Sequence, residues 1–170
     1  MDFMQFWELA SYVVTALGLP LAIFLFRLER RKERAVEEAQ VHELLSAAYT
    51  DFLKLVVANP DLRLRSPRAT PDLDEEQQDR VFAMFEILIS VFERAYLLGY
   101  GERLSDKSRR RWRSWEDFMR EWCRRDDFRA LLPRLLVGED PAFAAHLLRL
   151  AEETSAEAAA GAEAATPSRA

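Results

Sequence analysis

The sequence predicts an all-α protein in which an N-terminal transmembrane helix continues into a cytosolic bundle of about four helices. The composition is rich in Ala, Leu, Arg and Glu, with only five glycines in 170 residues, which favours helices. An uncharged stretch near the N-terminus is long enough to cross a bilayer. Later segments repeat apolar residues at helical spacing between Pro and Gly breaks. We expect an anchor (1–28), a charged juxtamembrane stalk (29–40), a helical bundle (41–153) and a disordered tail rich in Ala and Glu (154–170).

The predicted membrane span runs from Leu9 to Phe26, eighteen residues without a formal charge. As a helix it would be about 27 Å long, close to the thickness of the hydrocarbon layer. Tyr12 and other aromatic residues near its N-terminal end suit the headgroup layer. Gly18 and Pro20 are tolerated better in a membrane helix than in a soluble one, and we expect Pro20 to kink it.

The flanking charges predict the orientation of this span. Asp2 and Glu8 precede it without any Lys or Arg. A basic cluster follows it directly: Arg27, Arg30, Arg31, Lys32 and Arg34. The positive-inside rule places this cluster and the chain after it in the cytosol, so we predict a single-pass protein of the bacterial inner membrane with its N-terminus outside. A cleaved signal peptide and a buried soluble helix are the alternatives.

The first helix is expected to continue out of the membrane and to end at Asn59-Pro60, because the residue before proline disfavours helix. Residues 27–40 contain neither Gly nor Pro and many helix formers, as in a solvated stalk. An apolar seam then recurs at near-heptad spacing: Leu45, Tyr49, Phe52 and Val56. This seam fits self-association and packing inside the bundle equally well.

Proline and glycine divide the rest of the chain. Residues 60–72 form a connector with three prolines, after which Asp72 or Asp74 can cap a helix that runs to Leu98. That helix is apolar on nearly every side and should lie at the centre of the bundle. Charged residues within it, such as Glu93, argue against a second membrane span. Three more helices are expected. The first starts at Ser105 or Asp106 and ends near 124–126, and the other two span about 128–136 and 142–153.

The basic run at the start of the helix expected from Ser105 or Asp106 is the main candidate binding surface. This run supplies the candidate lipid- or partner-binding residues Lys107, Arg109, Arg110, Arg111 and Arg113. The cluster after the membrane segment supplies four more: Arg27, Arg30, Arg31 and Lys32. Anionic lipid headgroups or an acidic protein would suit such a surface. Nucleic acid is a less favoured partner. Alternatively, the arginines line a solvated face, where they pair with the acidic residues of 72–79.

Other residues are ascribed to packing or to ion pairs. The aromatic stripe of Trp112, Trp115, Phe118 and Trp122 has the spacing that burial alone requires. Glu86 and Glu93 share a face and are expected to form salt bridges with arginines, with a metal or proton-transfer site as the alternative. The two histidines, His42 and His146, lie far apart in the sequence. Cys123 is interpreted as a packing residue, although its basic neighbours would lower its pKa if it were exposed.

The layout resembles uncharacterised bacterial single-pass membrane proteins with a tryptophan-rich helical cytosolic domain. The residues that carry the likeness are Asn59-Pro60-Asp61-Leu62, FEILISVFERAYLLGYGERLS (85–105) and WRSWEDFMREWCRRDDFRALLP (112–133). The likeness covers most of residues 5–150 and implies a membrane anchor with no assigned reaction. Some similar proteins are suspected of roles in phage defence or membrane stress.

We find no motif for a catalytic, cofactor or metal site, and therefore predict a membrane-anchored interaction or regulatory module without catalytic activity. Its expected partners are the lipid bilayer and either another protein or further copies of the chain. One alternative is a membrane-bound stress or phage-defence effector that acts on the membrane. A tethered metal-dependent enzyme using Glu86 and Glu93 is less favoured.

Overall fold

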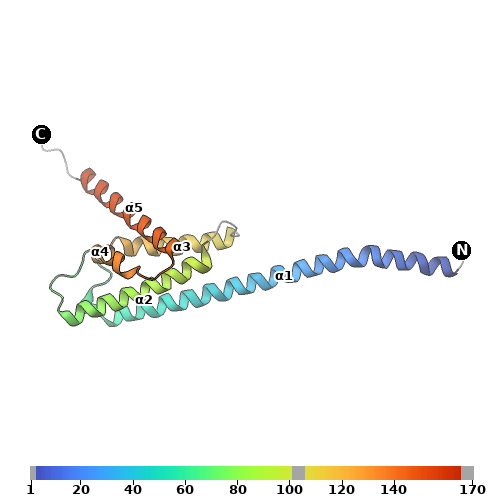
Figure 1. Ribbon diagram of the computed structural model, residues 1–170, viewed down its shortest axis with the longest axis horizontal. Helices are drawn as coiled ribbons and strands as arrows, with labels where there is room; N and C mark the ends of the chain where they lie inside the picture. The colour runs from blue at the N-terminus through green and yellow to red at the C-terminus, as the bar shows by residue number, and fades with distance from the viewer. Residues whose placement is uncertain (1–2, 101–105, 166–170) are drawn as a thin grey trace. The chain divides into compact units, whose positions relative to one another are not determined.

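The computed structural model describes the backbone of residues 3–100 and 106–165, and the side chains of 24–30, 36–37, 39–100 and 109–160. Within these residues the protein is helical and contains no strand, which confirms the predicted all-α class (Figure 1). The helices are α1 (Phe3–Ala58), the 3-10 helix η1 (Pro60–Leu62), α2 (Glu75–Gly99), α3 (Asp106–Cys123), α4 (Asp126–Leu135) and α5 (Pro141–Ala165).

The chain divides into two compact units, Met1–Glu43 and Leu44–Ala170, and α1 contributes to both. In the first unit the side chains from Phe24 to Arg30 are exposed, and the Arg30 guanidinium lies 5.1 Å from the centre of the Phe26 ring. Among the residues described, no helix is both long and apolar enough to pass through a membrane. Part of the predicted span and of the basic cluster lies outside the described side chains: Leu9, Tyr12, Gly18, Pro20, Arg31 and Lys32.

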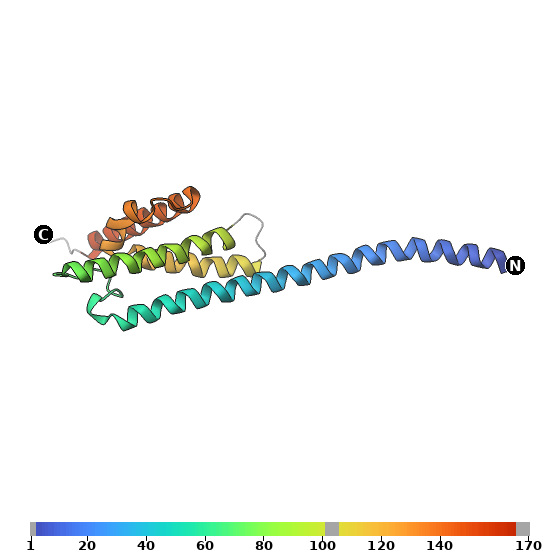
Figure 2. The same cartoon turned by 60° about the horizontal axis from the view of Figure 1, so that its bottom comes forward.

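The core of the second unit forms around α2, as predicted from its apolar surface. Figure 2 shows α2 running alongside α3. Ring contacts connect α2 with each of the other α-helices of this unit, for example Phe92 with Tyr49 of α1, at 6.4 Å between ring centres. Phe85 similarly contacts Trp122 of α3 and Phe128 of α4, at 6.4 and 5.0 Å. α2 therefore contacts every other α-helix of the unit, but it is not surrounded, because Ile87 and Leu97 are exposed on one side.

The apolar seam on α1 packs inside the bundle. All four of its side chains, at positions 45, 49, 52 and 56, are less than 9% exposed. Tyr49 stacks on Phe118 at 4.7 Å, and Phe52 lies edge-on to Trp122 at 5.4 Å. Of the two interpretations open for this seam, packing within the chain is therefore the one that the structure supports.

Several helix ends follow their local signals. α1 stops at Ala58, where the Asn59 side chain donates a hydrogen bond to the carbonyl of Leu55 at 2.8 Å. Asp74 caps α2 in a reciprocal capping box with Gln77. The predicted end of the first helix at Asn59-Pro60 and the predicted cap of α2 at Asp74 are thus confirmed.

The last helix differs from the prediction, since an end near Glu153 is wrong. α5 continues to Ala165 through most of the segment expected to be a disordered tail. Thr154 is buried and its hydroxyl bonds to the carbonyl of Leu150, at 3.0 Å, whereas the side chains of 155–160 are exposed. Beyond Thr154 the helix therefore rests on the high helix propensity of Ala and Glu, which needs no core contact.

Candidate functional site

The predicted basic surface lies on the solvent side of α3. Arg109, Arg110 and Arg113 are exposed and Arg111 is half-buried, and we call these four residues the basic face. The side chain of Lys107 lies outside the described residues. α3 is strongly amphipathic, since its tryptophans are buried on the opposite side. The prediction of a solvated arginine face is confirmed.

The acidic segment 72–79 does not lie near this face. Trp112 packs against Tyr96, near the end of α2, whereas Trp122 packs against Phe85, so the two helices run antiparallel. Residue 79 is about 25 Å along α2 from Tyr96, at the rise of an α-helix. The alternative in which the basic face pairs with 72–79 is therefore wrong.

The aromatic stripe forms part of the core, as predicted. Trp112, Trp115 and Trp122 are buried, and Phe118 is half-buried. Trp122 also donates a hydrogen bond from Nε1 to the Tyr49 hydroxyl at 3.1 Å. These contacts account for the tryptophans as packing residues.

A buried arginine, which sequence reasoning missed, holds the proline-rich connector against the bundle. Arg125 is 1% exposed, and its Nη1 donates to the carbonyl oxygens of Arg63 and Ser66, both at 2.9 Å, and of Arg68 at 3.2 Å. Asp127 provides the countercharge, 2.8 Å from Nη2 and 2.6 Å from Nε. A charge this deeply buried is tolerated because Nη1 and Nη2 are hydrogen-bonded and the carboxylate balances the charge, although Nε makes only the ion-pair contact and no hydrogen bond.

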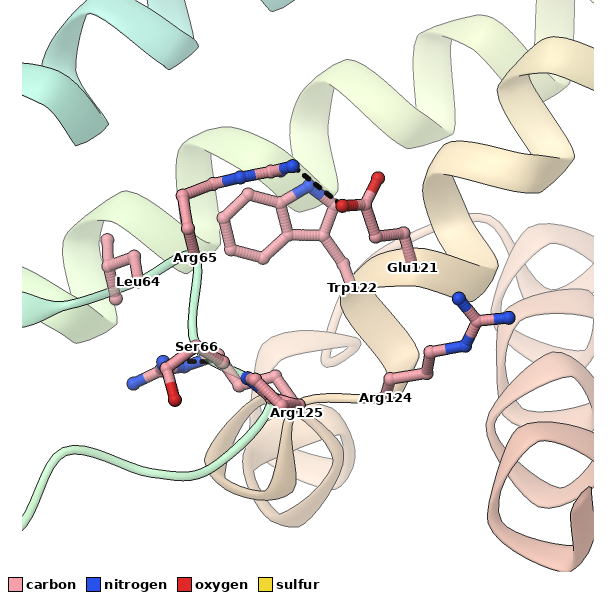
Figure 3. A pocket seen from close by; sticks show the side chains of 8 residues that line it. Leu64, Arg65, Ser66, Glu121, Trp122, Arg124 and Arg125 are labelled. Carbon is pink, nitrogen blue, oxygen red and sulfur yellow. Dashed lines mark hydrogen bonds and ion pairs between the residues drawn. The ribbon is translucent and has the colours of Figure 1, made fainter. Parts of the chain in front are cut away.

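The surface beside Arg125 contains a small hollow of about 180 Å³. Figure 3 shows Arg65 paired with Glu121 over the Trp122 ring, while the Arg124 side chain extends away from Ser66. The charges of Arg65 and Arg125 are thus already matched by carboxylates, at 2.6 Å in each case. We ascribe this region to structure and not to ligand binding.

Glu86 and Glu93 differ in their surroundings, against the expectation that both bind arginines. Glu93 accepts a hydrogen bond from the backbone nitrogen of Asp140 at 2.6 Å, which ties the start of α5 to α2. Burial raises the pKa of the nearby Glu139, and the hydrogen bond and negative charge of Glu93 raise it further. Glu86 is exposed. Within the described part of the chain, no group of three or more His, Cys, Asp or Glu could hold a metal ion.

Cys123 is buried in the core, as predicted. Burial raises the pKa of its thiol to about 12, and this outweighs the opposing effect of Arg129 and Arg120. The thiol is therefore protonated at neutral pH and inaccessible as a nucleophile.

His146 is the most perturbed titratable group on α5. It is 3% exposed and packs against the rings of Tyr96, Tyr100 and Trp112. An Nη2 of Arg149 lies 2.7 Å from its Nδ1. Burial, assisted by the nearby charges of Arg149 and Arg120, lowers the pKa of His146 to about 4. The ring is therefore neutral at neutral pH.

We expect His146 to make the domain acid-sensitive. The unfolded chain takes up this proton near pH 6.5 and the folded chain only near pH 4, so the unfolded state binds more protons between these values. The free energy of unfolding should therefore fall by about 3 kcal/mol as the pH is lowered through this window. Urea unfolding of wild type and His146→Leu is measured at several pH values. The carboxylates contribute to the pH dependence of both proteins, so the difference between the two profiles gives the contribution of His146. Parallel pH profiles for the two proteins would contradict it.

An open groove lies between α1 and α2 in the second unit. It has a volume of about 580 Å³ and is lined by Ala48, Asp51, Phe52, Leu55, Glu86, Ile87, Ser90, Val91 and Arg94. Leu55 and Ile87 are each 42% exposed there, and Leu44 (71%) and Leu97 (55%) lie further along the same two helices. We call this surface the α1/α2 groove. Sequence reasoning missed it, because it exists only where two distant segments meet.

Comparison of the chain with models of protein families, with curated proteins and with solved structures gives no match.

Proposed function

We propose that this chain is an interaction module, without catalytic activity of its own, that is held at the cytosolic face of a membrane by its N-terminal helix. The α1/α2 groove is the single observation that carries the interaction role. A groove of this size with exposed Leu55 and Ile87 is typical of a surface that another helix covers.

The membrane tether in this proposal rests on the amino-acid pattern. Eighteen uncharged residues are followed at once by Arg27 and its basic neighbours. The basic face provides a second contact, because exposed arginines near a bilayer attract anionic headgroups by about 1 kcal/mol each. Anchor and basic face together would keep the groove close to the membrane surface.

Membrane fractionation tests the tether. The full-length chain is expected to remain in the membrane pellet after alkaline carbonate extraction, which strips proteins bound only by charge. Release into the supernatant would contradict an anchored protein. Growth arrest or ion leakage on expression would instead favour an effector that acts on the membrane.

Charge reversal tests the basic face. The triple variant Arg109→Glu, Arg110→Glu and Arg113→Glu is expected to bind a short-chain anionic lipid about a hundredfold more weakly than wild type, since each arginine contributes about 1 kcal/mol. The purified full-length chain in mild detergent is titrated with this lipid and binding is measured by calorimetry, because the N-terminal helix would hold every variant on a vesicle.

A matched control carries the same change in net charge elsewhere. Arg63, Arg68 and Arg124 are also exposed basic residues of the second unit, and their reversal to Glu should leave far more of the binding in place. Equal losses in both variants would mean that only net charge matters and would remove the basic face from the proposal. Helicity by circular dichroism should be unchanged in both.

A further inference from the structure

We propose that the occupant of the α1/α2 groove is a second copy of the same chain, packed so that α1 of each copy covers α2 of the other. This inference rests on the proposed function, because it names the partner of the interaction module. In such a two-fold symmetric dimer, the same surface of each copy covers that of the other, so the exposed apolar side chains of both grooves are buried together.

The charges along the groove are self-complementary. Its α1 side carries Asp51, and its α2 side carries Arg94 and, about two helical turns away, Glu86. Within the chain Asp51 pairs with Lys54 at 2.8 Å, in a contact where both side chains are about 70% exposed and therefore weakly held. Among the described side chains, Arg94 makes no hydrogen bond or ion pair. An unmatched cation at the edge of an apolar groove suits a carboxylate from the molecule that fills it.

Asp51 and Arg94 lie about one helical turn apart along the bundle. Tyr49 contacts Phe92, and Arg80 donates a hydrogen bond to the Asn59 side chain at 2.8 Å, so α1 and α2 are antiparallel. Asp51 is therefore level with Ser90, four residues from Arg94. Side chains one turn apart meet readily, as in ion pairs within a helix. A two-fold axis parallel to the helices keeps these heights and exchanges the α1 and α2 sides. Each Arg94 then faces Asp51 of the other copy, and the contact occurs twice.

The centre of the groove permits close approach of two helices. Ala48 on α1 and Ser90 on α2 are small, and both line the groove beside Leu55 and Ile87. Small residues with flanking aliphatic ones let ridges of one helix pack into the grooves of another. An axis parallel to the helices also gives residues 44–58 of α1 the same direction in both copies, which suits two chains anchored in one membrane. Confinement to that membrane would raise their effective concentration.

Charge exchange between two variants tests this pairing. Arg94→Glu and Asp51→Arg are each made in the full-length chain, carry different tags and are purified in mild detergent. Each variant alone places like charges opposite each other twice, so its self-association should be about a hundredfold weaker than that of wild type. An equimolar mixture restores both opposite-charge contacts, and a dimer with one copy of each variant is expected. Light scattering and tag co-purification measure these results.

The matched control uses a charge pair outside the groove. Arg68→Glu and Glu152→Arg change exposed residues in the same way, and each variant should dimerise like wild type. Unchanged thermal unfolding of all four variants confirms that folding is intact. A monomeric wild type over the accessible concentrations, or a mixture that stays monomeric, would overturn the dimer.

Failure of the dimer is distinguishable from failure of the proposed function. If wild type is monomeric but Ile87→Glu releases a different, stoichiometric protein, the interaction module stands and the second copy is wrong. If wild type is monomeric and Ile87→Glu changes the binding of no other protein, both the dimer and the interaction role of the groove are wrong. Val137→Glu serves as the control for Ile87→Glu, because Val137 is 79% exposed and lies outside the groove.

Discussion

Replacing Arg125 by leucine is expected to lower the free energy of unfolding of the helical bundle by about 3 to 5 kcal/mol, the usual cost of removing one partner of a buried ion pair. The Asp127 carboxylate would lose its countercharge, and three connector carbonyls would lose their donor. Urea unfolding followed by circular dichroism measures the loss.

The neighbouring Arg124 provides a close control. Its side chain is exposed, and Arg124→Leu should change the free energy of unfolding by less than about 0.5 kcal/mol. Arg125→Lys keeps the charge but cannot reproduce the fork of donors, so its loss should lie between those of the other two variants. Hydrogen exchange adds a local measurement: the amide of Asp126, which donates to the Pro67 carbonyl at 3.1 Å, should lose protection in Arg125→Leu. Similar losses in Arg124→Leu and Arg125→Leu would contradict this role of Arg125.

The second large effect is expected at Trp122. Trp122→Ala should lower the free energy of unfolding by about 3 to 5 kcal/mol, the range for removing a large aromatic side chain from a core. The ring contacts Phe52, Phe85 and Phe128, so the cavity would open where three helices besides α3 meet. Chemical denaturation of the purified protein measures the change.

A milder variant separates the packing of Trp122 from its hydrogen bond. Trp122→Phe keeps most of the apolar contact but removes the donor to the Tyr49 hydroxyl, which should cost about 1 kcal/mol for that bond, plus a smaller loss of packing. Tyr49→Phe and the double variant complete a thermodynamic cycle, in which a coupling energy near zero would show that the hydrogen bond contributes nothing. Burial is the main cause that raises the pKa of Tyr49, so its hydroxyl stays protonated throughout.

Much of the fold could be predicted because its signals are local. The stop at Asn59-Pro60 and the cap at Asp74 each depend on residues within one turn of the helix end. The contribution of α2 to the core follows from its many apolar residues, although Glu86, Ile87 and Arg94 leave one side of it exposed. The buried spacing of Trp112, Trp115 and Trp122 is equally a property of one segment.

The polar features were harder to predict. The run Arg124-Arg125-Asp126-Asp127 looks like surface charge, yet Arg125 is buried and Arg124 is exposed. The difference arises because the connector, about sixty residues earlier in the chain, supplies carbonyl acceptors to only one of the two. Glu86 and Glu93 share a helix face in the sequence, but α5 reaches only Glu93. No pattern within a single segment distinguishes the members of these pairs.

The helical class, the order of the main helices, and the apolar sides of α1 and α3 could be predicted from the amino-acid pattern, because they depend on propensity and on periodicity within a segment. Which polar residues are buried, which carboxylate meets which donor, and where the surface stays open between α1 and α2 became clear only from the folded chain. Such properties depend on contacts between residues far apart in the chain, and the free energy of one buried charge depends on everything that surrounds it.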